Sequence, residues 1–201
     1  MKEILNNEIL NNQYPDYEID CEITLSITKA NIYGTMFFIV IIGISIIIHS
    51  MLWGFDSIDN VLNSGYFLYV FIMVVIFGSI IHEFLHGFGY VVFGGVSWKE
   101  VKFGVIWRWL IPYAGCRVPI TLSAYRLSII LPGIVLGIIP TFIGLMLGNG
   151  WLTIWGSFSI AGAFGDLMIF ILLLKHSTAK TNLVFDNPNK IGCYLFRNKN
   201  K

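Results

Sequence analysis

Charge is scarce in this 201-residue chain: Asp, Glu, Lys and Arg together make up only 12% of its residues. An average soluble domain carries about 25%. Hydrophobic residues account for 56% of the chain before its 20 glycines are counted. Such a chain cannot cover its surface with polar groups in water, which excludes an ordinary soluble globule, a coiled coil and a disordered chain. The net charge of +1 gives no indication of a nucleic-acid partner.

Cysteine is equally scarce, and its placement excludes two further classes of protein. Cys21, Cys116 and Cys193 are the three cysteines of the chain, and they are far apart in the sequence. This spacing matches neither a disulfide framework nor a zinc knuckle. We therefore predict three ordinary unpaired thiols.

Uncharged stretches locate four expected membrane helices, because about 20 apolar residues are needed to cross roughly 30 Å of hydrocarbon. The expected helices cover about 35–53, 66–93, 127–147 and 151–174. The last two share one uncharged run, and Gly148-Asn149-Gly150 supplies the turn between them. The sequence thus predicts an all-α integral membrane protein, with residues 1–201 forming one membrane-embedded domain.

The segments between these helices differ in positive charge. All 13 Lys and Arg fall in three of them, with two in 1–34, five in 94–126 and six in 175–201, whereas 54–65 and 148–150 hold none. Positive residues concentrate on the cytoplasmic side of membrane proteins. We therefore predict a multi-pass cell-membrane protein whose two termini and 94–126 connection lie in the cytoplasm.

Alternating apolar residues predict short strands within the cytoplasmic segments. One such run covers 19–27, just before the first helix. A second begins at Val101 and ends at Pro112, and the run 116–120 follows it, which predicts a small β-hairpin between helices two and three. Residues 182–186 and 191–196 predict further strands near the C-terminus.

Only two of the 25 charged residues, Glu83 and Asp166, lie inside the expected helices. An intramembrane carboxylate costs a few kcal/mol and calls for a partner or a function. Glu83 belongs to the HExxH pattern His82-Glu83-Phe84-Leu85-His86. On a helix, His82 and His86 project from one face and can hold a single Zn²⁺, while Glu83 can act on the attacking water as a general base. The alternative is a hydrogen-bonded polar cluster that joins helices, but such a cluster does not require this spacing.

A catalytic zinc site needs a third protein ligand and an open position. Asp166 is our leading choice, because it is 15 residues past the expected start of helix four and His82 is 16 past that of helix two, which places the two at nearly one depth. Glu100 is a distant second choice, since it lies outside the helices. His49 in the first helix remains an alternative ligand, and His176 is expected at the membrane boundary. A third histidine of the metzincin type is absent, because position 92 is Val.

These residues resemble those of a known family. The HEFLH motif in a second helix, Gly165-Asp166 in a later one and Asp186-Asn187-Pro188 in a short tail are similar to the putative zincin peptidases, small bacterial membrane proteins that look related to the site-2 proteases. The resemblance implies one zinc ion per chain held by His82, His86 and Asp166, with Glu83 as the catalytic base. It further implies hydrolysis of a peptide or transmembrane protein substrate in or beside the membrane lipid.

One other class of function stays open at this point. A non-enzymatic membrane protein could use the same His and Asp residues to bind or move a divalent metal. Glu83 favours the enzyme, because a site that only binds metal has no need of a general base. The sequence gives no indication of an oligomeric state.

Overall fold

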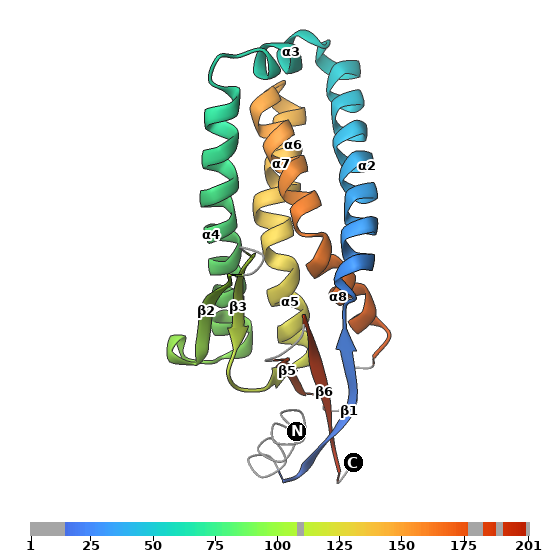
Figure 1. The fold of residues 1–201 in the computed structure, drawn as a ribbon, viewed down its shortest axis with the longest axis vertical. Helices are drawn as coiled ribbons and strands as arrows, with labels where there is room; N and C mark the ends of the chain where they lie inside the picture. Colours follow the sequence, from blue (N-terminus) through green and yellow to red (C-terminus); the bar gives the residue numbers. More distant parts are fainter. Residues whose placement is uncertain (1–14, 108–110, 177–182, 188–190, 200–201) are drawn as a thin grey trace.

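The computed structural model describes residues 15–107, 111–176, 183–187 and 191–199. Long helices lie side by side over most of its length, and two small sheets lie at one end, where the strands nearest to both termini are found (Figure 1). The helical elements are α2 Ile27–Trp53, α3 Asp56–Leu62, α4 Phe67–Gly94, η1 Trp98–Glu100, α5 Leu122–Pro132, η2 Gly133–Ile138, α6 Ile139–Leu147, α7 Gly150–Gly162 and α8 Phe164–Leu174. The strands are β1 Tyr17–Thr24, β2 Val101–Ile106, β3 Ile111–Cys116, β4 Ile120–Thr121, β5 Leu183–Asp186 and β6 Gly192–Asn198.

The first two expected helices form, with one change of length and one unexpected element. Helix α4 agrees with the predicted 66–93 to within one residue at each end, whereas α2 begins eight residues before the predicted residue 35. The additional residues at its N-terminal end include Lys29, whose charge placed it outside the uncharged stretch from which the helix was predicted. The short helix α3, which was not predicted, joins α2 to α4 at the end of the molecule opposite the sheets (Figure 1).

The third and fourth expected helices are both irregular. The third runs from Leu122 to Leu147 and contains a π-helical stretch, η2, directly after Pro132, which has no backbone N–H to donate to the helix. The fourth is broken at Ala163 into α7 and α8, which meet at a bend of 52°. Among the described residues, three helices are therefore long and apolar enough to cross a membrane, and a fourth span is present if the bent pair is counted as one.

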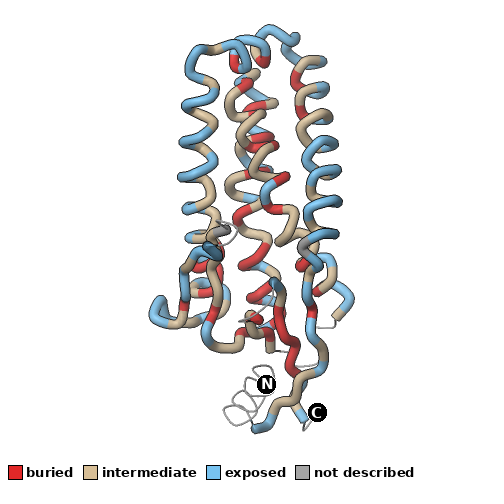
Figure 2. Tube along the Cα trace, in the orientation of Figure 1, coloured by how far each residue is buried: buried red, intermediate tan, exposed pale blue. Residues whose placement is uncertain are grey.

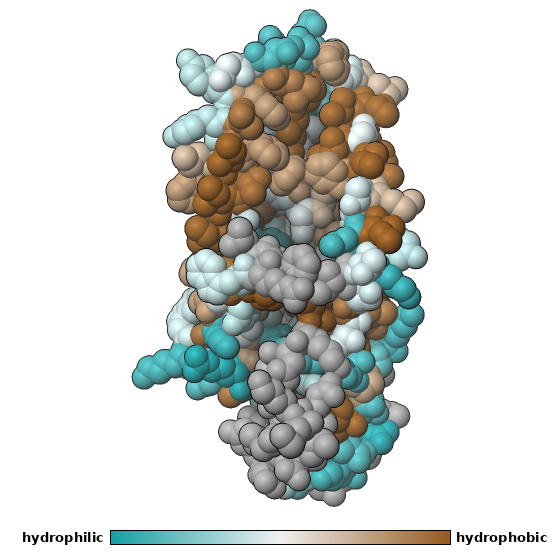
Figure 3. Space-filling model, viewed as in Figure 1, coloured by the Kyte–Doolittle hydropathy of each residue, from teal (hydrophilic) through white to brown (hydrophobic). Residues whose placement is uncertain are grey.

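The outer helices expose their apolar side chains. None of the most apolar 18-residue window of α4 is buried, and only 11% of that of α2 is. Figure 2 shows both helices exposed along most of their length, and Figure 3 shows hydrophobic residues over the helical part of the visible face, with hydrophilic residues gathered toward the two ends. A helix that is apolar all round is stable only when protein or lipid covers it. The structure is accordingly compatible with a membrane protein.

The prediction of an all-α protein is wrong. Two antiparallel sheets accompany the helices, one of four strands in the order β1-β6-β5-β4 and one of two strands, β2-β3. The larger sheet pairs Tyr17 with Asn198, so it joins segments from opposite ends of the chain. Local alternation indicated these strands, but each strand finds its backbone hydrogen bonds only when a distant partner is in place. The sheet packs under the helices and contributes Val184, Cys193 and Leu195 to the buried core.

The hairpin also differs in detail from the prediction. Its second strand is β3, which includes Pro112 opposite Val105, rather than the expected 116–120. Proline is accepted here because the hairpin sheet has only two strands, so each strand leaves one side without ladder hydrogen bonds. Ile120 instead pairs with Val184 of the larger sheet.

One buried carboxylate attaches the tail strands to the helices. Asp186 accepts hydrogen bonds from the Tyr125 hydroxyl and from the backbone N–H of Cys116, each at 2.7 Å. Burial raises the pKa of Asp186 above its usual value. Pro188 of the tail motif lies outside the described residues. The three cysteines are free thiols, as predicted.

Close packing of α7 against the η2–α6 segment yields our first prediction. A Cβ atom added at Gly156 would meet the Thr141 hydroxyl and backbone N and would lie 2.7 Å from the Gly137 carbonyl oxygen. We expect Gly156→Ala to lower the free energy of unfolding by about 1–3 kcal/mol, because overpacking forces backbone shifts. Gly43→Ala is the matched control, since nothing lies within 4 Å of its added Cβ. Thermal unfolding in detergent micelles measures the difference, and equal stability of the two variants would contradict the packing seen here.

Candidate metal centre

The HExxH histidines lie one turn apart on α4 and point at the same space. Their Nε2 atoms are 3.1 Å apart. The side chain of His86 is almost completely buried, at 7% exposed, whereas that of His82 is 18% exposed. The spacing of four residues therefore places two imidazoles together, as the motif predicts.

Asp166 from α8 completes a cluster with these histidines. Its Oδ2 atom lies 3.0 Å from Nε2 of His82, and its Oδ1 atom lies 3.5 Å from Nε2 of His86. Asp166 occupies the first turn of α8, directly after the break at Ala163. The bend between α7 and α8 thus sets the direction in which the carboxylate enters the cluster.

The spacing of the donor atoms fits a zinc ion. One donor atom from each of the three residues lies within 4.8 Å of the others. In a tetrahedral site with bonds of about 2.1 Å, ligand atoms are about 3.4 Å apart, and the three closest distances here are 3.0, 3.1 and 3.5 Å. Two imidazoles and a carboxylate are also the ligand types that zinc accepts at catalytic sites, with the fourth position left open.

A carbonyl group behind His86 determines which of its nitrogens faces the cluster as an acceptor. Nδ1 of His86 lies 3.1 Å from the backbone oxygen of Ser128 on α5. An N–H at Nδ1 donates to this oxygen, which leaves a lone pair on Nε2 of the neutral ring, as a metal ligand requires. The Ser128 carbonyl therefore holds the His86 ring in the orientation that ligation through Nε2 requires.

Gly89 makes this contact between α4 and α5 achievable. A Cβ atom at this position would lie only 2.7 Å from Cα of Ser128. The missing side chain lets the two helices approach until His86 reaches the Ser128 carbonyl. Ser128 could not be identified from the sequence, because a backbone carbonyl leaves no signal in the residue type. A glycine three residues after His86 is the sequence feature that fits this close approach.

Glu83 lies beside the cluster and lines a cavity of about 210 Å³ that also reaches His82, Ser79 and Ser159. Pro112 on β3 lines the same cavity. The hairpin therefore closes one side of the site, next to the carboxylate that the motif assigns as a base.

The other titratable residues considered from the sequence lie outside this cluster. His49 is fully buried and contacts the hydroxyls of Thr153 and Ser57. Glu100 lies in η1, and His176 contacts Cys21. Of the alternatives raised by the sequence, the structure brings Asp166 to the two histidines and leaves these three elsewhere.

Comparison with known proteins gives one family. A family model described as putative zincin peptidase matches residues 75–180, more than half of the chain, and the match includes both histidines, Glu83 and Asp166. Comparisons with curated proteins and with solved structures gave no match. Zincins are zinc peptidases, so the match makes zinc the metal to expect and a hydrolase the class of enzyme. On this match, the chain belongs to the putative zincin peptidase family.

Proposed function

We propose that this protein is a zinc-dependent endopeptidase, similar to the site-2 proteases, that cleaves peptide bonds within or next to a membrane. The observation that carries the proposal is the meeting of His82, His86 and Asp166 beside a cavity lined by Glu83. The three ligand side chains would hold one zinc ion per chain. Peptides and transmembrane proteins are the substrates that fit this setting.

Each residue at the site has a definite task in the reaction. Zinc, when bound, supplies a Lewis acid that acidifies a water molecule and polarises the scissile carbonyl. Glu83 takes the proton from the water and passes it to the leaving amine. The Ser128 carbonyl fixes the His86 ring, and β3 borders the cavity that Glu83 lines.

The depth of the site supports cleavage close to one membrane surface. His82 lies 15 residues after Phe67 at the start of α4, about 22 Å along the helix. The remaining 12 residues to Gly94 lead toward the sheets, where polar segments meet water. Water therefore has a short path to the site from the sheet end of the molecule.

The size of the cavity restricts how a substrate can enter. At about 210 Å³ it has room for side chains but not for a helix about 10 Å wide. A helical substrate also keeps its carbonyl groups in internal hydrogen bonds. We infer that the substrate must unwind locally and present an extended segment beside Glu83.

The proposed orientation places the sheets and the nearby metal cluster on the cytoplasmic side of the cell membrane, with α3 outside. The segment 54–65 contains α3 and holds no Lys or Arg, whereas 94–126 and 175–201 hold 11 of the 13. This distribution agrees with the positive-inside rule. Both termini are then cytoplasmic.

Cysteine labelling of intact cells tests this orientation. Asn63 and Asn149 are exposed at the end opposite the sheets, so we expect Asn63→Cys and Asn149→Cys to react with a membrane-impermeant maleimide added outside. Lys99→Cys is the control, because Lys99 is exposed on the sheet side and should react only after the cells are opened. Reaction of Asn63→Cys only in opened cells would overturn the orientation.

A further inference from the structure

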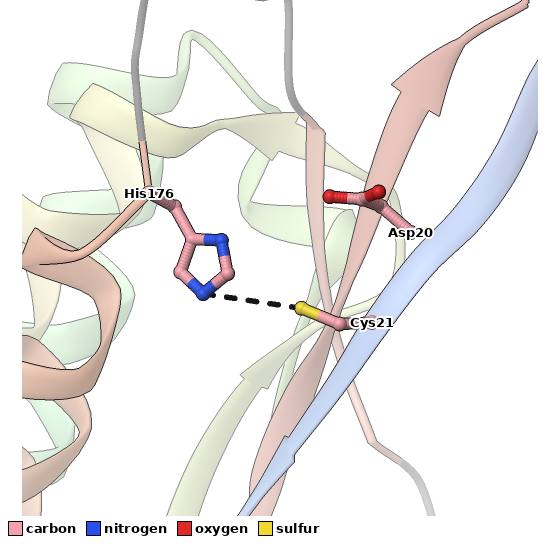
Figure 4. Close-up of side chains that lie close together, drawn as sticks. All are labelled: Asp20, Cys21 and His176. Carbon is pink, nitrogen blue, oxygen red and sulfur yellow. Dashed lines mark hydrogen bonds between the residues drawn. The ribbon is translucent and has the colours of Figure 1, made fainter.

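A second group of metal-binding side chains lies away from the zincin motif. Asp20 and Cys21 on β1 and His176 just after α8 each present a donor atom within 4.8 Å of the others. Nε2 of His176 lies 3.9 Å from Sγ of Cys21. Figure 4 shows both side chains of β1 directed toward His176.

An irregularity in β1 explains how two adjacent residues, Asp20 and Cys21, can present their side chains on the same side of the sheet. Neighbouring side chains of a regular strand point to opposite faces of a sheet. In β1 the pairing register shifts, because Ile19 pairs with Phe196 and Cys21 pairs with Leu195, which leaves Asp20 as an extra residue. A β-bulge of this kind re-aims a side chain, and here it brings Asp20 to the side of the sheet that Cys21 faces.

We propose that Asp20, Cys21 and His176 form a second Zn²⁺ site, separate from the catalytic one. Thiolate, imidazole and carboxylate are the three ligand types that zinc uses in proteins. With a Zn–S bond of about 2.3 Å and a Zn–N bond of about 2.1 Å, tetrahedral S and N ligands lie about 3.6 Å apart. The distance of 3.9 Å therefore requires a shift of a few tenths of an ångström, and water completes the coordination.

The surroundings leave these donors accessible to a metal. Arg197 lies beside Asp20, with its Nη1 3.8 Å from the Asp20 carboxylate, but its Nη2 makes a closer contact of 2.8 Å with Glu18. Cys21 and His176 are only partly buried. Asp20 is exposed, so an ion can enter from water.

A nucleophilic Cys–His pair is the other function that such residues could serve. That function needs only the thiol and the imidazole. Here the Asp20 carboxylate adds a third donor atom within 4.8 Å of the other two. Three donors of this kind around one point favour metal ligation.

A zinc ion at this place would join β1 to the end of α8. His176 is ten residues beyond Asp166, which enters the first cluster from the opposite end of α8. The ion would thus fix both the strand that precedes α2 and the helix that carries the third catalytic ligand. We assign it a structural role, because the lining of the cavity at Glu83 includes none of its ligands.

Zinc content of the purified full chain is the first test. We expect wild type to bind two equivalents, and Cys21→Ala and His176→Ala to lose one each while they keep the other. Cys116→Ala is the matched control, because this buried thiol is part of neither cluster. Retention of two equivalents by both Cys21→Ala and His176→Ala would overturn the proposal.

Cobalt substitution distinguishes the two sites, since only the second contains sulfur. Co²⁺-loaded wild type should show near-ultraviolet thiolate-to-cobalt charge-transfer absorption, which Cys21→Ala loses and Cys116→Ala keeps. The His82→Ala/His86→Ala double variant should keep this absorption as well, so a failure of the catalytic proposal would leave the result unchanged. Absence of the absorption from cobalt-loaded wild type would refute the second site even if Cys21→Ala proved unstable.

Discussion

Glu83→Gln should abolish most proteolysis and leave the zinc in place. Glu83 is not one of the three clustered ligands, and glutamine preserves its shape while removing its basicity. General base catalysis contributes about 10²–10⁴-fold to rates, so we expect a loss of that size in kcat. Cleavage of fluorescent casein and of a single-pass transmembrane peptide in the same micelles, together with zinc content, measures both effects.

Glu100→Gln is the control for this variant. Glu100 is an acid in η1 on the same connection as the hairpin, but it belongs to neither the cluster nor the cavity lining. The Glu100→Gln variant should retain full proteolytic activity. Wild-type turnover by Glu83→Gln would contradict the proposed base and would favour a protein that only binds or moves metal.

Asp166→Asn should remove the zinc and the activity together. The substitution keeps one oxygen near His82 but removes the negative charge that offsets the metal, so the ion would be held by two neutral imidazoles and a weak amide ligand. Loss of a residue that merely orients a ligand already costs about 10–100-fold in metal affinity. We therefore expect a loss larger than this, measured by competition with a fluorescent zinc chelator.

Asp59→Asn is the matched control for the loss of a carboxylate. Asp59 lies on α3, where its side chain accepts a hydrogen bond from Asn63. The zinc affinity of the Asp59→Asn variant should equal that of wild type. Wild-type zinc affinity in Asp166→Asn, with thermal stability unchanged, would exclude Asp166 as a ligand and reopen the choice of the third ligand.

The metal-binding side chains of the candidate site could be predicted from the sequence, whereas the backbone contacts around them could not. The spacing of His82 and His86 is local, so the helical repeat alone placed them on one face. Asp166 was found by counting residues from the helix ends. The count works because α4 is continuous and α7 is helical to Gly162, so the bend at Ala163 comes only three residues before Asp166. The Ser128 carbonyl was beyond such reasoning, because a backbone group carries no residue-type signal and becomes a neighbour of His86 only through packing.

Hydropathy and charge by themselves determined where the long helices lie, because the cost of placing a charge in lipid is a property of each segment alone. The sequence likewise determined the HExxH pair and the family it indicates. Only the tertiary structure decided that the terminal strands join one sheet, that the fourth apolar segment bends by 52° at Ala163, and that a bulge turns Asp20 toward His176. These features depend on contacts between segments far apart in the chain, and the composition of a segment carries no information about such contacts.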